Sequence, residues 1–133
     1  MDRKAPKLLV VVGDRIDPLL AEYALKVAVR LDLAIIVLFV DEDSGGRGAG
    51  QGREAVEHFE AVVEGEAAEF SARALKMAVK VTTVVDVDDR ASAIAQLRKQ
   101  EPEIRFILAD DENDKERGTA DRPYPRLTVI RPT

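Results

Sequence analysis

The stretch KLLVVVGDRIDPLLAEYALKVAVRLDLAIIVLFV, residues 7–40, decides the fold class of this chain. It opens on a continuous apolar run that stops at Gly13-Asp14, which is typical of a strand buried on both faces. It closes on a second run of the same kind, AIIVLFV at residues 34–40. The two runs, with a helical pattern between them, predict the strand–helix–strand unit of a parallel sheet.

The segment between these two runs predicts the helix. Asp17-Pro18 marks its start, because Asp caps the first amides of a helix and Pro suits its first turn. Asp32 lies where the helix must stop, and Asp tolerates the left-handed backbone conformation better than most residues. Between these ends, apolar residues recur at helical spacing: Leu20, Tyr23, Ala24, Val27, Ala28 and Leu31.

The chain after residue 52 continues the alternation of helix and strand. A long helical pattern covers residues 53–79, and Gly65 in its middle allows a bend. Its apolar face is expected to consist of Val56, Phe59, Val63, Phe70, Ala74 and Met77. After it we expect strands at 81–87, 105–109 and 126–131, and a helix at 90–100 that Asp88 or Asp89 can cap.

This order of elements predicts an α/β domain with an open five-stranded parallel sheet and helices on both faces. We expect residues 1–133 to form a single domain, with flexible loops at 41–52 and 110–125. The second loop carries almost no apolar residue and cannot offer an amphipathic helix. The fourth crossover helix should therefore be missing or vestigial.

Composition excludes several classes of function. The chain has no cysteine and a single histidine, His58, which argues against disulfides, thiolate chemistry and histidine metal clusters. Its net charge of −5 disfavours nucleic-acid binding. The longest apolar run, residues 33–40, is too short to cross a bilayer, and no signal-peptide pattern is found. We therefore expect a cytoplasmic protein that does not bind membranes and is not an enzyme.

Several stretches together resemble the universal stress protein family. Residues 7–40 resemble its opening strand–helix–strand, with Glu22-Tyr23-Ala24-Leu25 particularly close. Residues 80–94 resemble the third strand and the start of the third helix, and 104–109 and 127–132 resemble the fourth and last strands. The resemblance implies a Rossmann-like sheet in the order 3-2-1-4-5, a role in the stress response and a homodimer through the last strand. Leu127, Val129, Ile130 and Arg131 would then form the dimer interface.

Many members of that family bind ATP through a glycine motif after the fourth strand. Here the matching segment reads DDENDKERGT, residues 110–119, and only Gly118-Thr119 corresponds to the end of the motif. Glycines let backbone amides approach phosphates closely, whereas Asp110, Asp111, Glu112 and Asp114 would place carboxylates there. Like charges about 6 Å apart repel by roughly 3 kcal/mol at an effective dielectric of about 20. We therefore expect a degenerate nucleotide-binding site, no conventional ATP binding and no cofactor.

An acidic carboxyl edge is the most informative feature left. The predicted strands end at Asp14, at residues 41–43 (Asp-Glu-Asp), at Asp86, Asp88 and Asp89, and at Asp110-Asp111. Ligands of open α/β sheets bind at this edge, where the strand order reverses. The candidate cofactor-binding residues are Gly13, Asp14, Val40 and Asp110, and Asp14 and Asp110 are the candidate Mg²⁺ or Ca²⁺ ligands. Helix capping and solvated loops are the competing interpretation of the same carboxylates.

Two functions remain open from the sequence. The first is a non-catalytic binding or regulatory module that acts as a homodimer, with a further protein partner that the sequence does not identify. The alternative is a Mg²⁺-dependent adenine-nucleotide-binding protein that uses the acidic edge, with weak hydrolysis.

Overall fold

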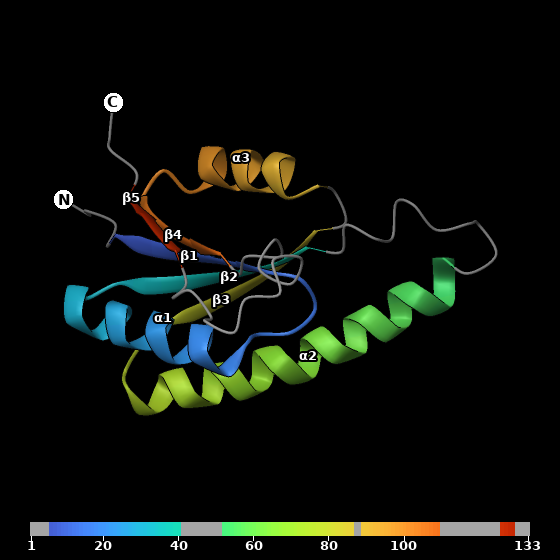
Figure 1. The fold of residues 1–133 in the computed structure, drawn as a ribbon, viewed down its shortest axis with the longest axis horizontal. Coiled ribbons are helices and arrows are strands. Elements are labelled where there is room, and N and C mark those ends of the chain that lie inside the picture. Colours follow the sequence, from blue (N-terminus) through green and yellow to red (C-terminus); the bar gives the residue numbers. More distant parts are fainter. Residues whose placement is uncertain (1–5, 41–51, 87–88, 110–125, 130–133) are drawn as a thin grey trace, which may run out of the picture.

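The computed structural model describes residues 6–40, 52–86, 89–109 and 126–129. Helices and strands alternate through these ranges, as the sequence pattern predicts (Figure 1). In chain order they are β1 (Lys7–Val12), α1 (Pro18–Leu31), β2 (Ala34–Val40), α2 (Gly52–Lys76), β3 (Val81–Asp86), α3 (Arg90–Gln100), β4 (Ile104–Ala109) and β5 (Arg126–Val129).

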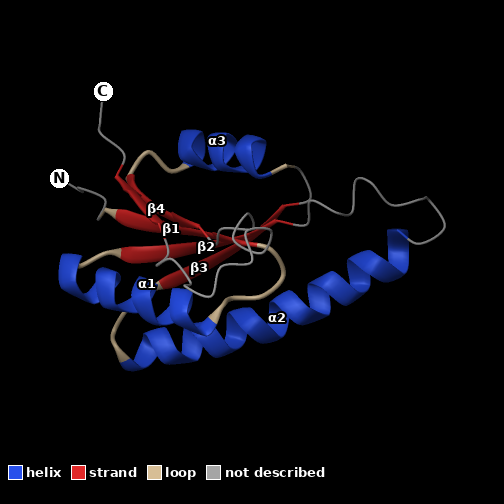
Figure 2. Ribbon diagram, in the orientation of Figure 1, coloured by secondary structure: helices blue, strands red, loops and turns tan. Residues whose placement is uncertain are grey.

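Four of these strands form a parallel sheet in the order β3-β2-β1-β4. Helices α1 and α2 cover one face of the sheet and α3 covers the other (Figure 2). This arrangement follows from right-handed crossovers, because α1 and α2 carry the chain in one direction across the sheet and α3 carries it back. The predicted α/β class, the parallel sheet and the helices on both faces are confirmed.

The predicted parallel direction of the fifth strand is not confirmed. The backbone of β5 pairs antiparallel with β4, with Ala109 opposite Arg126 and Phe106 opposite Val129. For β5 to be parallel, the chain would have to return from the carboxyl ends of the strands to their amino ends, usually through a helix packed on one face of the sheet. Residues 110–125 supply almost no apolar side chain, so such a crossover would bury little surface. The expected loss of the fourth helix lies outside the described residues.

The two faces of the sheet bury two separate cores. Leu8, Val10 and Val12 point toward the α1–α2 side, and Leu9 and Val11 point toward α3. All five are fully buried, which explains why β1 reads as a continuous apolar run and shows no alternation.

The ends of α1 match the prediction. The Asp17 side chain accepts hydrogen bonds from the amides of Leu19 and Leu20, at 3.0 and 3.2 Å, and Pro18 opens the helix. Asp32 ends it in the left-handed conformation, with φ of 56°. Leu31, in contrast, is not part of the core, since 45% of it is exposed.

Helix α2 runs without interruption through Gly65 and ends at Lys76, three residues before the predicted boundary. Phe59, Val63, Phe70 and Ala74 are buried as expected, and the Val56 side chain lies outside the described residues. Met77 follows the helix and is 43% exposed, so its predicted place in the core is wrong. Within the described ranges, no helix is long and apolar enough to span a membrane.

Candidate functional site

The point where the strand order reverses lies between β1 and β4. From β1 the chain passes through α1 to β2 on one side, and α3 brings it from β3 to β4 on the other. Val11 and Ala109 are the last paired residues of the two strands. In open α/β sheets, ligands bind outside the carboxyl ends of the strands at such a point.

The predicted site residues occupy different environments there. Gly13 directly follows β1 and is half-buried, and Asp14 beside it is exposed. Val40 ends β2, but its side chain is buried in the core under α3, so only its backbone faces the edge. Asp110 follows β4 in sequence and lies outside the described residues, and so its predicted pairing with Asp14 stays a prediction.

The loop after β1 is held by carboxylates of the chain itself. The amide of Ile16 donates a hydrogen bond to Oε1 of Glu66, in the middle of α2, at 2.7 Å. Asp17 bonds the first free amides of α1, those of Leu19 and Leu20. Three amides of this loop and of the helix start, those of Ile16, Leu19 and Leu20, are therefore already bonded to negative groups and are not free to hold a phosphate.

The start of α3 shows the same arrangement. Asp89 accepts a hydrogen bond from the amide of Ser92 at 2.8 Å and another from the Ser92 hydroxyl at 3.1 Å. These bonds, the backbone one first, hold the pKa of the Asp89 carboxyl below its ordinary value. The interpretation of Asp17 and Asp89 as helix caps is confirmed.

The acidic residues of this edge do not form a metal site within the part of the chain that the structure describes. No group of three or more potential ligands is found there. Asp14 is exposed, Asp86 is half-buried at the end of β3, and Asp89 is engaged as a cap. The other acidic residues of the predicted edge, Asp41, Glu42, Asp43, Asp88, Asp110 and Asp111, lie outside the described residues.

The predicted dimer interface is described only in its backbone. Leu127 and Val129 belong to β5, the last strand in the sheet order, and Ile130 and Arg131 lie outside the described residues.

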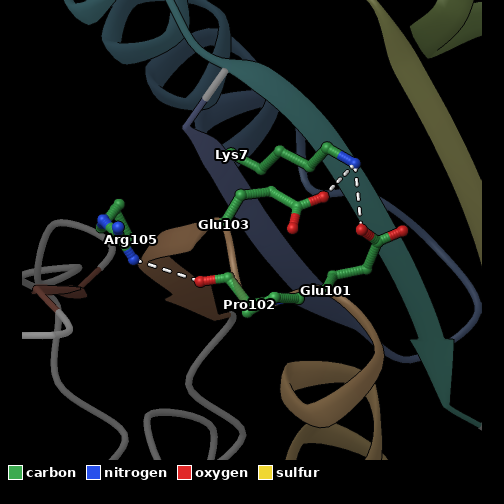
Figure 3. Close-up of polar contacts among 5 residues, drawn as sticks. All are labelled: Lys7, Glu101, Pro102, Glu103 and Arg105. Carbon is green, nitrogen blue, oxygen red and sulfur yellow. Dashed lines mark hydrogen bonds and ion pairs between the residues drawn. The ribbon is translucent and has the colours of Figure 1, made fainter. Parts of the chain in front are cut away.

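A polar cluster that was not predicted from the sequence lies at the other end of the sheet, beside the amino ends of β1 and β4 (Figure 3). Nζ of Lys7 lies 2.8 Å from Oε1 of Glu103 and 3.2 Å from Oε2 of Glu101. Glu103 is only 7% exposed. Lys7 begins β1 and Glu103 directly precedes β4, and the starts of neighbouring parallel strands lie side by side. The sequence contains one signal for this contact: a lysine stands at the start of one apolar strand, and a glutamate directly precedes the strand that becomes its neighbour.

Contacts within this cluster shift the pKa values of Lys7 and Glu103. Hydrogen bonding with the Glu101 carboxyl, and then with Lys7, lowers the pKa of Glu103 to about 2. Glu103 in turn is the main cause that raises the pKa of Lys7. The cluster joins the start of β1, the start of β4 and the end of α3. It lies at the amino ends of these strands, whereas the switch point lies at their carboxyl ends, so we interpret the cluster as a contact that stabilises the fold.

Comparison with known proteins gives a likeness of fold. No protein-family model matches the chain, and no curated protein resembles it significantly in sequence. Among solved structures, it is similar to universal stress protein UspA from Lactobacillus plantarum, with a TM-score of 0.58 and 19% identity. The match covers 80% of this chain and 78% of that one. At this level of identity the likeness is one of architecture, and the chain has the fold of a universal stress protein.

Proposed function

We propose that this protein is a non-catalytic binding or regulatory module of the universal-stress-protein type, and that it does not bind ATP in the conventional way. One observation carries the proposal. In the loop after β1 and in the first turn of α1, the amides of Ile16, Leu19 and Leu20 are already bonded to Glu66 and Asp17. Helix N-termini bind anions through free amides, and a cap carboxylate both occupies these amides and repels phosphate.

The proposed assembly is a homodimer through β5. This strand is last in the sheet order, so one side of its backbone has no partner strand within the described sheet. Unpaired strand edges favour pairing with another chain. Leu127, Val129, Ile130 and Arg131 are the proposed interface residues.

Light scattering after gel filtration tests the assembly. We expect twice the chain mass of 14.6 kDa for the wild type. Lys substitutions at Leu127 and Val129 should shift the protein toward monomer, because edge charges oppose strand pairing. Val85→Lys, on the opposite edge strand β3, is the matched control and should leave the dimer intact. A wild-type monomer at tens of micromolar would contradict the proposed dimer.

The alternative, Mg²⁺-dependent nucleotide binding, depends on Asp14 and Asp110 lying close enough to share a cation. Asp14→Asn and Asp110→Asn separate the two functions. A shared metal site requires Mg²⁺ or Ca²⁺ to raise the melting temperature of the wild type more than that of either variant, at matched ionic strength. Our proposal expects equal shifts in all three proteins. A cation response that both substitutions remove would favour the alternative.

A further inference from the structure

A groove lies between the C-terminal ends of α1 and α2, far from the switch point. Its volume is about 640 Å³, and it is lined by residues of α1 from Tyr23 to Leu31 together with Met77, which directly follows α2. Tyr23 and Val27 form its floor, since both are half-buried and packed against the core. Both helices end just before the strands that follow them begin, so the groove lies at the opposite end of the sheet from Gly13 and Asp14 (Figure 1).

The rim of the groove is apolar and exposed. Val29, Leu31 and Met77 are 50%, 45% and 43% exposed, and all three line the same hollow. Single exposed apolar residues are ordinary on a protein surface, but several gathered around a concave site mark an interaction surface. Leu75 differs from these three residues. It is 78% exposed near the end of α2 but does not line the groove.

The charged residues of the groove are cationic. Lys26 and Arg30 line it. Lys26 is paired with Glu22 at 3.0 Å, and this bond is the first cause of the lowered pKa of Glu22. For Arg30 the described residues provide no ion pair. A cation in the last turn complements the helix dipole, which accounts for Arg30 alone but leaves the apolar rim around it unexplained.

We propose that this groove binds an acidic amphipathic helix of a partner protein. Positive charge on a chain whose net charge is −5 selects an acidic partner at this place, and the apolar rim provides the contact area. A helix laid along the groove touches the α1 rim and Met77 together, in the helix-in-groove mode. The proposal is independent of dimer formation through β5.

Fluorescence anisotropy with a designed peptide tests the proposal. The probe is a labelled helix of about five turns, with Leu on one face and Glu on the other, and its counterpart carries Lys for Glu. The variants are Arg30→Glu and Leu31→Glu. Their matched controls are Arg98→Glu, also in the last turn of its helix, and Leu75→Glu. All four positions are exposed, so thermal melting should show four folded variants.

We expect saturable binding of the acidic peptide by the wild type, weakened about tenfold by each groove variant and at most about twofold by the controls. The Lys counterpart should bind at least about tenfold more weakly than the Glu peptide. Equal binding of both peptides, or equal effects of groove and control variants, would overturn the proposal. So would binding to phosphatidylglycerol vesicles alone, or self-association that the groove variants abolish, because a membrane or a second copy would then be the occupant.

Discussion

The backbone amide of Ile16 donates a hydrogen bond to Oε1 of Glu66 at 2.7 Å, across 50 positions of sequence. This bond joins the loop after β1 to the middle of α2. Glu66 is half-buried, so the bond is shielded in part from competing water. The relationship fixes the loop that carries Asp14 and removes one amide from those available to a ligand.

Glu66→Ala should destabilise the protein by about 1–3 kcal/mol, because the amide of Ile16 then loses its acceptor in a partly buried site. Glu66→Gln keeps an oxygen acceptor and should cost less. The measurement is the free energy of unfolding in urea. Glu69→Ala, at an exposed position one turn further along α2, is the control. If Glu66→Ala and Glu69→Ala have the same effect, the bond does not hold the loop.

Gly65→Ala should stabilise the protein by up to about 1 kcal/mol, because Gly is the poorest helix former except Pro and α2 continues through this position. A Cβ at Gly65 would meet nothing within 4 Å, so no clash opposes the gain. Urea denaturation measures the change, and the reverse exchange Ala68→Gly, also exposed on α2, should lower stability by a similar amount. A destabilised Gly65→Ala protein would contradict a continuous, unobstructed helix at this position.

Ala78→Gly should also stabilise, by about 0.5–1 kcal/mol, because Ala78 has a φ of 59° in the turn after α2. Gly adopts this conformation without strain, although its more flexible unfolded chain offsets part of the gain. Ala95→Gly, at an exposed position inside α3, should instead destabilise by about 1 kcal/mol. Thermal melting of the two variants must therefore move in opposite directions, and a shared direction would contradict the assigned backbone.

The cluster of Lys7, Glu101 and Glu103 predicts how stability depends on pH. The pKa of Glu103 is lowered from 4.5 to about 2, so its stabilisation is present above pH 4.5 and is lost as the pH falls toward 2. The pKa of Lys7 is raised above 10.5, so its contribution is complete below pH 10.5 and is lost as the pH rises above it. Glu103→Gln should destabilise the protein by about 1–3 kcal/mol near pH 7.

Unfolding in urea at a series of pH values measures this dependence. The difference between wild type and Glu103→Gln should shrink as the pH falls below 4.5, where the carboxylate becomes protonated in the unfolded state. Glu60→Gln, on the exposed side of α2, provides the control and should show a small difference that does not depend on this pair. A constant difference between wild type and Glu103→Gln from pH 7 to 3 would show that the ion pair does not stabilise the fold.

Much of the fold was predictable because local signals agreed with one another. The apolar runs of β1 and β2, the Asp17 cap and the left-handed Asp32 each have a local physical cause, and the structure confirms them. The direction of β5 was not predictable in this way, since strand pairing is set by the route of the connection. Residues 110–125 have no apolar face and therefore do not favour a crossover helix. Without such a helix, an antiparallel fifth strand is the simpler connection, although the sequence pattern was interpreted as a parallel strand.

The candidate site was less predictable than the fold. The caps at Asp17 and Asp89 could be anticipated, because capping depends on neighbours along the chain. The bond from Ile16 to Glu66 and the cluster of Lys7 with Glu103 join residues far apart in sequence, and no local pattern specifies their geometry. The apolar rim at Met77 was missed because the helical pattern was extended past the true end of α2 and placed this residue in the core.

Calorimetric titration of the wild-type protein with ATP, first with chelator and then with Mg²⁺, tests the central claim most directly. Sodium tripolyphosphate at matched ionic strength is the control for simple screening. Because carboxylates already hold the amides of Ile16, Leu19 and Leu20, the account predicts no saturable heat at millimolar ATP in either condition and no rise in melting temperature. Saturable ATP binding with chelator present, with a melting temperature that rises with ATP concentration, would contradict it.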